Sequence, residues 1–236
     1  MRKITMVAAM LAMAMPLAAQ GGMAGMDMTK KIQGSGKLPD GWMVRFDPVF
    51  ARGNRPAPPT PTLTDVDVRS MGAGIHFTTG PAGIYYNPKD MGSGEFAISA
   101  TFSAKKSMAH EAYGIFIGGS NLQDATQSYI YFEIRPGMGD SILIQRRNGD
   151  DPKQMQKIAA WTSTGGVVHT DDPADGHSSN TLKIHVAKDA VHFYVNDKMV
   201  KEVKKSDLMG ASTDGQTGIR INHNSDLHVE WKGVSK

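Results

Sequence analysis

The sequence predicts an all-β protein, a two-sheet antiparallel sandwich or a barrel with about a dozen strands and minimal helix. Short segments in which apolar and polar residues alternate follow one another, and turn residues bound each of them. The dipeptides Asn148-Gly149 and Asn196-Asp197 tolerate the positive φ of tight hairpin turns. No long window carries an apolar stripe of helical period, and residues 205–209 offer one helical turn at most.

Composition narrows the classes of protein before any motif is considered. The 236 residues suffice for one large domain. The 26 basic and 23 acidic residues leave a net charge of +3, too small a basic field to predict a nucleic-acid partner. Cysteine is absent, which excludes a disulfide scaffold, a thiolate metal site and a thiol nucleophile. Stability must therefore come from an apolar core.

Residues 1–19 have the pattern of a signal peptide. Arg2 and Lys3 precede an apolar run over 4–17, and small residues follow where a signal peptidase cleaves. The run is shorter than the roughly 20 apolar residues of a membrane span, so no transmembrane anchor is expected in the mature chain. We expect a secreted or periplasmic protein.

The remaining chain divides into a flexible leader over 20–38 and a single β-sandwich domain over 39–236. The leader is rich in Gly, Lys and Gln and has no periodicity. Residues 52–61 are rich in proline, which cannot donate ladder hydrogen bonds, and they predict an extended surface loop. Asp65 and Asp67 follow this loop and are interpreted as turn or capping residues.

The expected strands are justified one by one by apolar residues at every second position between turn residues. The pair flanking Asn196-Asp197 forms one expected hairpin, and residues 141–147 are the expected hairpin partner of 129–135. In chain order the strands are 42–46, 75–78, 83–86, 95–102, 113–118, 129–135, 141–147, 156–161, 181–187, 191–196, 198–203, 217–222 and 227–231.

The strand pattern over 180–186, 190–198 and 217–221 resembles the closing strands of concanavalin A-like lectin/glucanase (laminin-G-like) jelly rolls. The stretch from 83 through 96–100 to 128–135 is similar to the secreted bacterial 3-keto-disaccharide-hydrolase-like branch of that superfamily. The resemblance covers roughly residues 42–231 and lies in strand pattern alone. It implies a jelly-roll sandwich of two curved sheets, whose concave face commonly meets glycans.

One expected strand carries a row of polar side chains on a single face. Tyr129, Tyr131, Glu133 and Arg135 alternate with apolar residues, so the four share the face turned away from the core. Tyrosine rings stack on the C–H groups of sugars, and charged groups pair with hydroxyls. We interpret the row as a candidate ligand site, the alternative being a solvated face with cross-strand pairs.

Neighbouring strands extend this candidate site. Arg147 joins it from the expected hairpin partner, or Arg146 does if that strand turns its other face to the row. Arg220 and Asn222 join it from the strand over 217–222. His76, between two apolar residues, is placed on the same surface. The predicted ligand is a carbohydrate or glycoside, and Glu133 or His76 is the candidate catalytic base.

Whether the protein is an enzyme stays open at this point. Glycosidases generally need two carboxylates roughly 5 to 9.5 Å apart, and the Glu-x-Asp-x-x-Glu motif of the glucanases in the resembled superfamily is absent. The leading hypothesis is a secreted carbohydrate-binding sandwich. A sugar-active hydrolase or lyase of the 3-keto-disaccharide type is the second, and an envelope interaction module without a small ligand is the third.

No metal or cofactor is assigned from the sequence. His185 and His192 are expected to be neighbours across a hairpin, but spacing offers no third ligand for zinc. The acidic loop over 169–177 supplies oxygen ligands without the order of an EF-hand, so a structural calcium stays open and unassigned.

Overall fold

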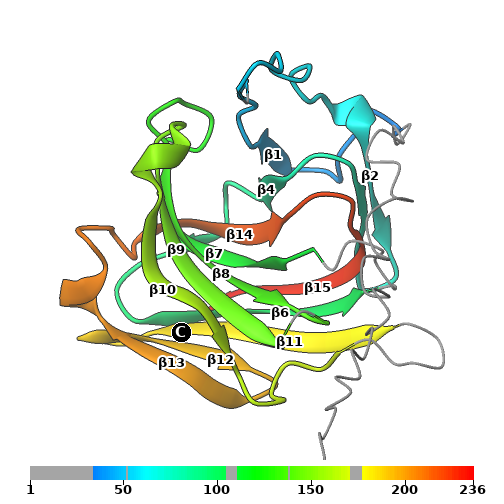
Figure 1. The fold of residues 1–236 in the computed structure, drawn as a ribbon. Coiled ribbons are helices and arrows are strands. Elements are labelled where there is room, and N and C mark those ends of the chain that lie inside the picture. The colour runs from blue at the N-terminus through cyan, green and yellow to red at the C-terminus, as the bar shows by residue number, and fades with distance from the viewer. Residues whose placement is uncertain (1–33, 52, 105–110, 138, 171–176) are drawn as a thin grey trace, which may run out of the picture.

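A computed structural model describes residues 34–51, 53–104, 111–137, 139–170 and 177–236, which form two antiparallel sheets packed face to face (Figure 1). The expected signal peptide, and the part of the expected leader up to residue 33, lie outside these residues. The described fold reaches back into that leader, because Gly34 N donates to Thr64 O at 2.8 Å and Leu38 packs against the core. No helix in the described part of the chain is long and apolar enough to cross a membrane.

Sheet I has eight strands in the order β1-β4-β14-β7-β8-β9-β10, with β5 paired to β14. Sheet II has seven strands in the order β13-β12-β11-β6-β15-β3-β2. The strands of sheet I are β1 (Met43–Phe46), β4 (Gly83–Tyr86), β5 (Met91–Gly92), β7 (Tyr113–Ser120), β8 (Ser128–Arg135), β9 (Ser141–Asn148), β10 (Gln156–Ser163) and β14 (Gly215–Ile221). Those of sheet II are β2 (Val66–Met71), β3 (Gly74–Thr79), β6 (Phe96–Ala104), β11 (Ser178–Val186), β12 (Ala190–Val195), β13 (Lys198–Lys204) and β15 (Asp226–Ser235).

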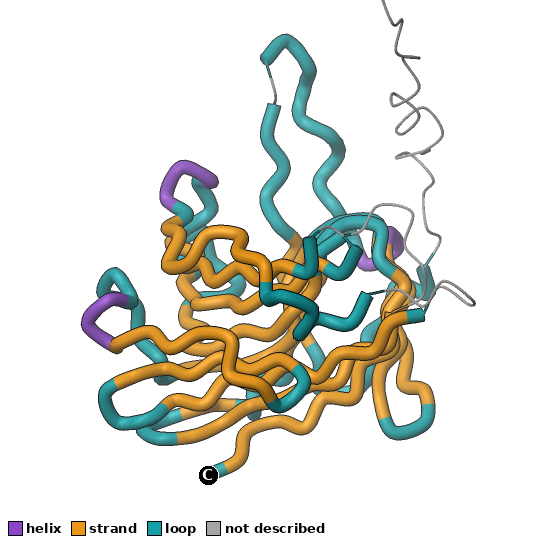
Figure 2. Tube along the Cα trace, turned by 60° about the horizontal axis from the view of Figure 1, so that its bottom comes forward, coloured by secondary structure: helices purple, strands orange, loops and turns teal. Residues whose placement is uncertain are grey.

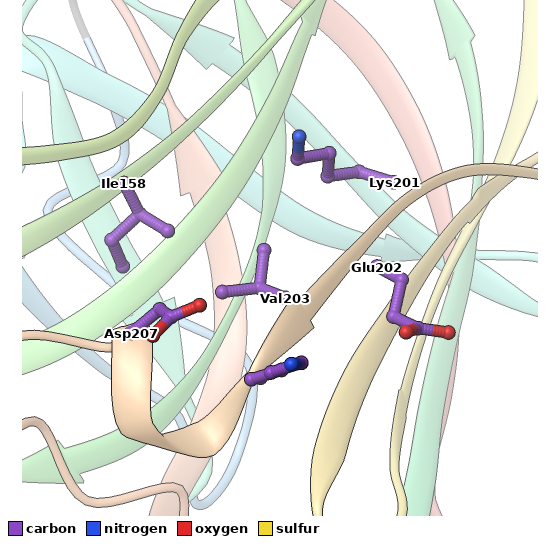
Figure 3. A pocket seen from close by; sticks show the side chains of 6 residues that line it. Ile158, Lys201, Glu202, Val203 and Asp207 are labelled. Carbon is purple, nitrogen blue, oxygen red and sulfur yellow. The ribbon is translucent and has the colours of Figure 1, made fainter.

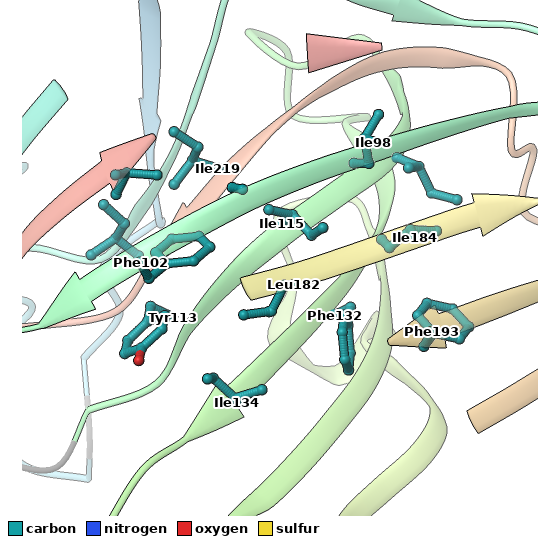
Figure 4. Packing of buried hydrophobic residues seen from close by; sticks show 14 of the residues in the cluster. Ile98, Phe102, Tyr113, Ile115, Phe132, Ile134, Leu182, Ile184, Phe193 and Ile219 are labelled. Carbon is teal, nitrogen blue, oxygen red and sulfur yellow. The ribbon is translucent and has the colours of Figure 1, made fainter. Parts of the chain in front are cut away.

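The core lies between the two sheets and is built from every second residue of the central strands (Figure 4). Aromatic pairs join the layers. Phe132 of β8 meets Phe193 of β12 edge-on with ring centroids 5.2 Å apart, and Phe102 of β6 stacks on Tyr113 of β7 at 4.8 Å. Such pairs add about 0.5–1.5 kcal/mol each to the free energy gained from apolar burial. The inner faces of both sheets thus form one core.

The two expected turns have different outcomes. Asn196 and Asp197 have φ of 49° and 63° and join β12 directly to β13, which confirms the tight hairpin. Beyond Asn148-Gly149 the chain instead makes a longer connection through the 3-10 helix η2 (Pro152–Gln154). The prediction of a tight two-residue turn there was therefore wrong. The side chain of Asp151 caps this helix by accepting from Lys153 N at 2.9 Å.

The segment after the Pro-rich loop also differs from expectation. Asp65 caps the 3-10 helix η1 (Leu63–Asp65), where it accepts from Thr62 N at 2.8 Å, as a capping role predicts. Asp67 lies within β2, a strand that the sequence pattern did not reveal. The Pro-rich loop itself stands out from the sheets as the tall loop with a short grey break in Figure 2. The single helical turn expected near residue 205 is a third 3-10 helix, η3 (Lys205–Asp207).

Candidate functional site

The outer face of sheet I, which points away from the core, carries a second cluster of buried side chains. Its rings lie in a line across the strands. Tyr86 contacts Phe116 with centroids 6.4 Å apart, Phe116 contacts Tyr129 at 5.3 Å, and Tyr129 contacts Tyr131 at 5.7 Å. Tyr129 is 1% and Tyr131 is 3% exposed, so these rings pack on one another and do not form an open platform.

The expected pairing of β8 with β9 is confirmed. Tyr129 lies opposite Arg147, and Tyr131 lies opposite Gln145. The Tyr131 hydroxyl donates to Gln145 Oε1 at 2.7 Å, which satisfies both buried groups. The row that alternation predicts on β8 therefore continues onto its hairpin partner.

Three charged side chains form a buried network at the centre of this face. Arg220 of β14 donates from Nη1 and Nη2 to the two carboxylate oxygens of Asp47 at 2.7 and 2.6 Å. Its Nε donates to Glu133 Oε1 at 3.4 Å. The side chains of Arg220 and Glu133 are 8% and 3% exposed, while that of Asp47 is 27% exposed. One guanidinium thus holds two carboxylates, and its carbon lies 5.6 Å from the Tyr131 ring centroid.

Gly114 makes this arrangement sterically feasible. The register places Gly114 of β7 between Arg220 of β14 and Glu133 of β8. With no side chain on the intervening strand, the Arg220 side chain can reach across to Glu133. A Cβ at this position would also lie 1.9 Å from the carbonyl oxygen of Phe132, so alanine cannot enter without displacing backbone.

Burial and charge move the pKa values of this network in opposite directions. Burial raises the pKa of Glu133 to about 7; Arg220 lowers it and Asp47 adds to the rise. Burial also acts to raise the pKa of Asp47, but the charge and hydrogen bonds of Arg220 outweigh it and hold this pKa below its usual value. Burial raises the pKa of Tyr129 to about 12. Arg220 and Asp47 are therefore a fixed ion pair, whereas Glu133 exchanges its proton near neutral pH.

Arg135 and Trp161 form the edge of the site on β8 and β10. The guanidinium carbon of Arg135 lies 4.3 Å from the centroid of the Trp161 ring. Trp161 is partly exposed and packs against the outer cluster. Its ring is the largest on this face that reaches solvent, and a flat indole next to a cation suits contact with a sugar ring.

Arg147 lies at the opposite end of the row and holds the connection between β9 and β10. It donates to Met155 Sδ at 3.2 Å and to the Asp150 carbonyl oxygen at 3.3 Å. The Asp150 carboxylate is occupied by Arg45 of β1, at 2.7 Å. The loop after β9 is thus tied both to the site row and to the first strand.

Two of the predicted site residues lie apart from this network. His76 lies on β3 in sheet II, where Ile75 and Phe77 face the core and His76 faces outward. Its Nε2 is 3.1 Å from Asp226 Oδ1. His76 and Glu133 are therefore on opposite outer faces, and the expectation that they share a surface was wrong. Asn222 follows the end of β14, and its backbone N donates to Ala112 O at 3.1 Å.

Sequence reasoning left Asp47, Gln145 and Trp161 out of the site. For Gln145 the signal was alternation, which places it on the same face as Arg147 in the strand over 141–147. For Trp161 the signal was an aromatic residue at the end of the expected strand over 156–161. Asp47 carries no such signal, because it lies 173 residues from Arg220.

Metal-binding arrangements are absent from the described residues: no group of three or more His, Asp or Glu side chains could hold an ion there. His185 and His192 are neighbours as expected, with their Nδ1 atoms 3.5 Å apart, and His192 Nε2 lies 3.2 Å from Glu202 Oε2. Residues 171–176 of the acidic loop, to which the calcium hypothesis applies, lie outside the described residues.

A shallow hollow of about 280 Å³ lies elsewhere, between β10 and β13 at the edges of the two sheets (Figure 3). It is lined by Ile158, Lys201, Glu202, Val203, Lys204 and Asp207. Its charged side chains come from the edge strand β13 and from η3 and are exposed to solvent, and it contains none of the buried ion pairs. We therefore place the candidate site on the outer face of sheet I.

Comparison with known proteins gives the fold. No protein-family model and no curated protein sequence matches the chain. Among solved structures, the carbohydrate binding module CBM66 from Bacillus subtilis superposes with a TM-score of 0.57 at 11% identity, covering 85% of this chain and 99% of that one. A protein of unknown function with a galectin-like fold, also from Bacillus subtilis, gives 0.57 at 12% identity, covering 86% and 92%.

An enzyme is among the similar structures as well. A glycoside hydrolase family 16 endo-glucanase from Bacteroides ovatus gives a TM-score of 0.54 at 9% identity, covering 82% of this chain and 93% of that one. At such identities the likeness shows the fold alone. The chain has the concanavalin A-like jelly-roll fold, as its strand pattern predicts.

Proposed function

We propose that this protein binds a carbohydrate on the outer face of sheet I, and that it is exported by the signal peptide expected over residues 1–19. The observation that carries the proposal is the buried network of Arg220, Asp47 and Glu133. Taking charges out of water costs several kcal/mol per ion, and a sandwich core does not require it. Strongly perturbed charged groups of this kind concentrate at functional sites.

The partly exposed Trp161 supplies the second requirement of a sugar site. Its ring lies beside Arg135, on the same face as the charged network. Sugar rings offer C–H groups to an aromatic face and hydroxyls to charged side chains. Among structures of the same fold, one is named a carbohydrate binding module and another an endo-glucanase, which supports a ligand of this class.

Calorimetry on wild type and Trp161→Ala, after a glycan-array screen, tests this proposal. We expect binding of a glycan that Trp161→Ala weakens about tenfold or more, which corresponds to about 1.4 kcal/mol. Tyr194→Ala is the matched control, because Lys183 Nζ lies 5.4 Å from the Tyr194 ring on the outer face of sheet II. A wild type that binds no glycan of a broad panel, or equal losses in both variants, would contradict the proposal.

A sugar-active hydrolase or lyase of the 3-keto-disaccharide type is the second candidate, and the raised pKa of Glu133 favours it. A carboxylate with a pKa of about 7 is suited to take a proton near neutral pH. His76 cannot act on the same substrate atom, because it lies on the other sheet. Incubation with 3-keto-glycosides should show turnover that Glu133→Gln abolishes, and absence of turnover by wild type across the panel would reject this candidate.

A further inference from the structure

The outer face of sheet I contains more arginines than carboxylates. Arg45 is paired with Asp150 at 2.7 Å, and Arg220 is paired with Asp47 at 2.6 Å. Arg135 and Arg147 lie on the same face, and neither has a carboxylate within 4.0 Å among the described residues. Asp47 and Glu133 are both held by Arg220, and they act on Arg147 and Arg135 only through space, without a direct ion pair.

Arg147 is a nearly buried cation whose partners are all uncharged. It is 5% exposed and donates only to a thioether sulfur and a carbonyl oxygen. Its Nε is buried and has no hydrogen-bond partner. The charge of Arg147 acts on Asp47 through space, but no carboxylate pairs with it directly, so part of its desolvation cost stays for an anionic partner to offset.

Arg135, at the other end of the row, is a partly exposed cation that also lacks a direct ion pair. Its guanidinium lies over the face of Trp161 and its Nε is buried without a hydrogen-bond partner. Arg147 lies opposite Tyr129, six residues before Arg135 along β8. At about 3.3 Å per residue, the backbone positions of the two arginines are about 20 Å apart along the sheet. One small anion cannot reach both.

We propose that the ligand is an acidic glycan, an oligosaccharide whose anionic groups recur along the chain and pair with Arg135 and Arg147. The inference rests on the proposed function and adds the chemical class of the sugar. The planar guanidinium matches the oxygens of a uronate carboxylate or a sulfate ester. Trp161, beside Arg135, would contact a sugar ring, and the Arg220 network on the strands between the two cations would contact hydroxyls.

Matched ligands that differ in charge test the inference. Calorimetry would compare an oligogalacturonate, its fully methyl-esterified form, and a sulfated galactan oligomer. We expect the acid to bind at least tenfold more tightly than the ester, and we expect its affinity to fall as salt rises. Tighter binding of the sulfated oligomer with the same arginine dependence would support the acidic class and identify sulfate as the group.

Variants assign the effect to the two arginines. Arg135→Gln should weaken binding of the acidic oligomer at least tenfold more than it weakens binding of the ester. Arg69→Gln is the control, because Arg69 is 62% exposed on β2 of sheet II. Arg147→Gln should act like Arg135→Gln, with thermal melting to check the loop that Arg147 holds; a misfolded Arg147 variant leaves Arg135→Gln to decide.

The outcomes separate this inference from the proposed function. Equal affinity for acid and ester, with loss in Trp161→Ala, would overturn the acidic class and leave glycan binding in place. Binding of the acid that Arg135→Gln does not change would also overturn it. Absence of binding to every glycan would remove both proposals.

Discussion

The two sheets share one core but differ on their outer faces. In sheet I, β8 and β9 are buried on both faces over most of their length. In sheet II, β6, β11 and β12 alternate between buried and partly or fully exposed residues. The outer side chains of sheet II form pairs that water can reach, such as Lys183 with Tyr194 and His192 with Glu202. The central strands of sheet II thus leave outer side chains accessible to solvent, whereas sheet I buries charged side chains on its outer face, away from the core.

Removing Arg220, the cation at the centre of the outer face of sheet I, should show the largest difference in stability between the two faces. Arg220→Met leaves the buried Glu133 and the partly buried Asp47 without their counter-ion, and we expect a loss of about 3–5 kcal/mol in the free energy of unfolding. The counterpart on sheet II, Lys183→Met, should change it by no more than about 0.5 kcal/mol. Urea denaturation measures both. Similar losses in the two variants would show that the faces are equivalent.

The pH dependence of stability should show the next largest difference between the two faces. The pKa of Glu133 is raised from 4.5 to about 7 in the folded state, so its contribution to stability is present below pH 4.5 and is lost as pH rises through 7. Relative to Glu133→Gln, wild type should lose about 3 kcal/mol between pH 4.5 and pH 8. Thermal melting across this range measures it.

The control for this profile is Glu202→Gln. The Glu202 side chain is 53% exposed on the outer face of sheet II. We expect this variant to keep the pH slope of wild type. If Glu133→Gln also kept that slope, the buried carboxyl would not be the source of the pH dependence.

Hydrogen bonds between neighbouring strands should give the smallest difference. Tyr131→Phe removes the donor to Gln145 Oε1 in a buried pair and should cost about 1–3 kcal/mol. Thr101→Val breaks the 2.9 Å hydroxyl contact with Thr181 on sheet II, where the groups are only partly buried, and should cost about 0.5–1 kcal/mol. A larger loss in Thr101→Val, measured by chemical denaturation, would reverse the order of the two faces.

Much of the fold could be predicted because strand periodicity is local. Alternation placed Glu133 on the face of Tyr131, and predicted that the strand of Arg147 pairs with theirs, without knowledge of the sheet order. It could not show how deeply these side chains are buried, because burial depends on loops and strands that are distant in sequence. The sheet that contains His76 was also undetermined, since alternation assigns a face of a strand and not its neighbours.

The candidate site could be predicted only in part for the same reason. Arg220 was visible on its strand, but its bidentate partner Asp47 comes from the end of the first strand. Likewise β2 was missed. The Pro-rich loop and Asp65 precede this strand and Asp67 lies near its start, and such residues suggest a turn. These are the places where tertiary context outweighs the local pattern.

The ion pair between Asp47 and Arg220 also has a consequence for the order of folding. The two residues are separated by 173 positions, and their strands are not adjacent in the sheet. Closing so long a loop is entropically costly, so we expect the pair to form after the folding transition state. Loss of Arg220 should then accelerate unfolding and leave the refolding rate nearly unchanged. The site would be the last part of sheet I to assemble and the first to open.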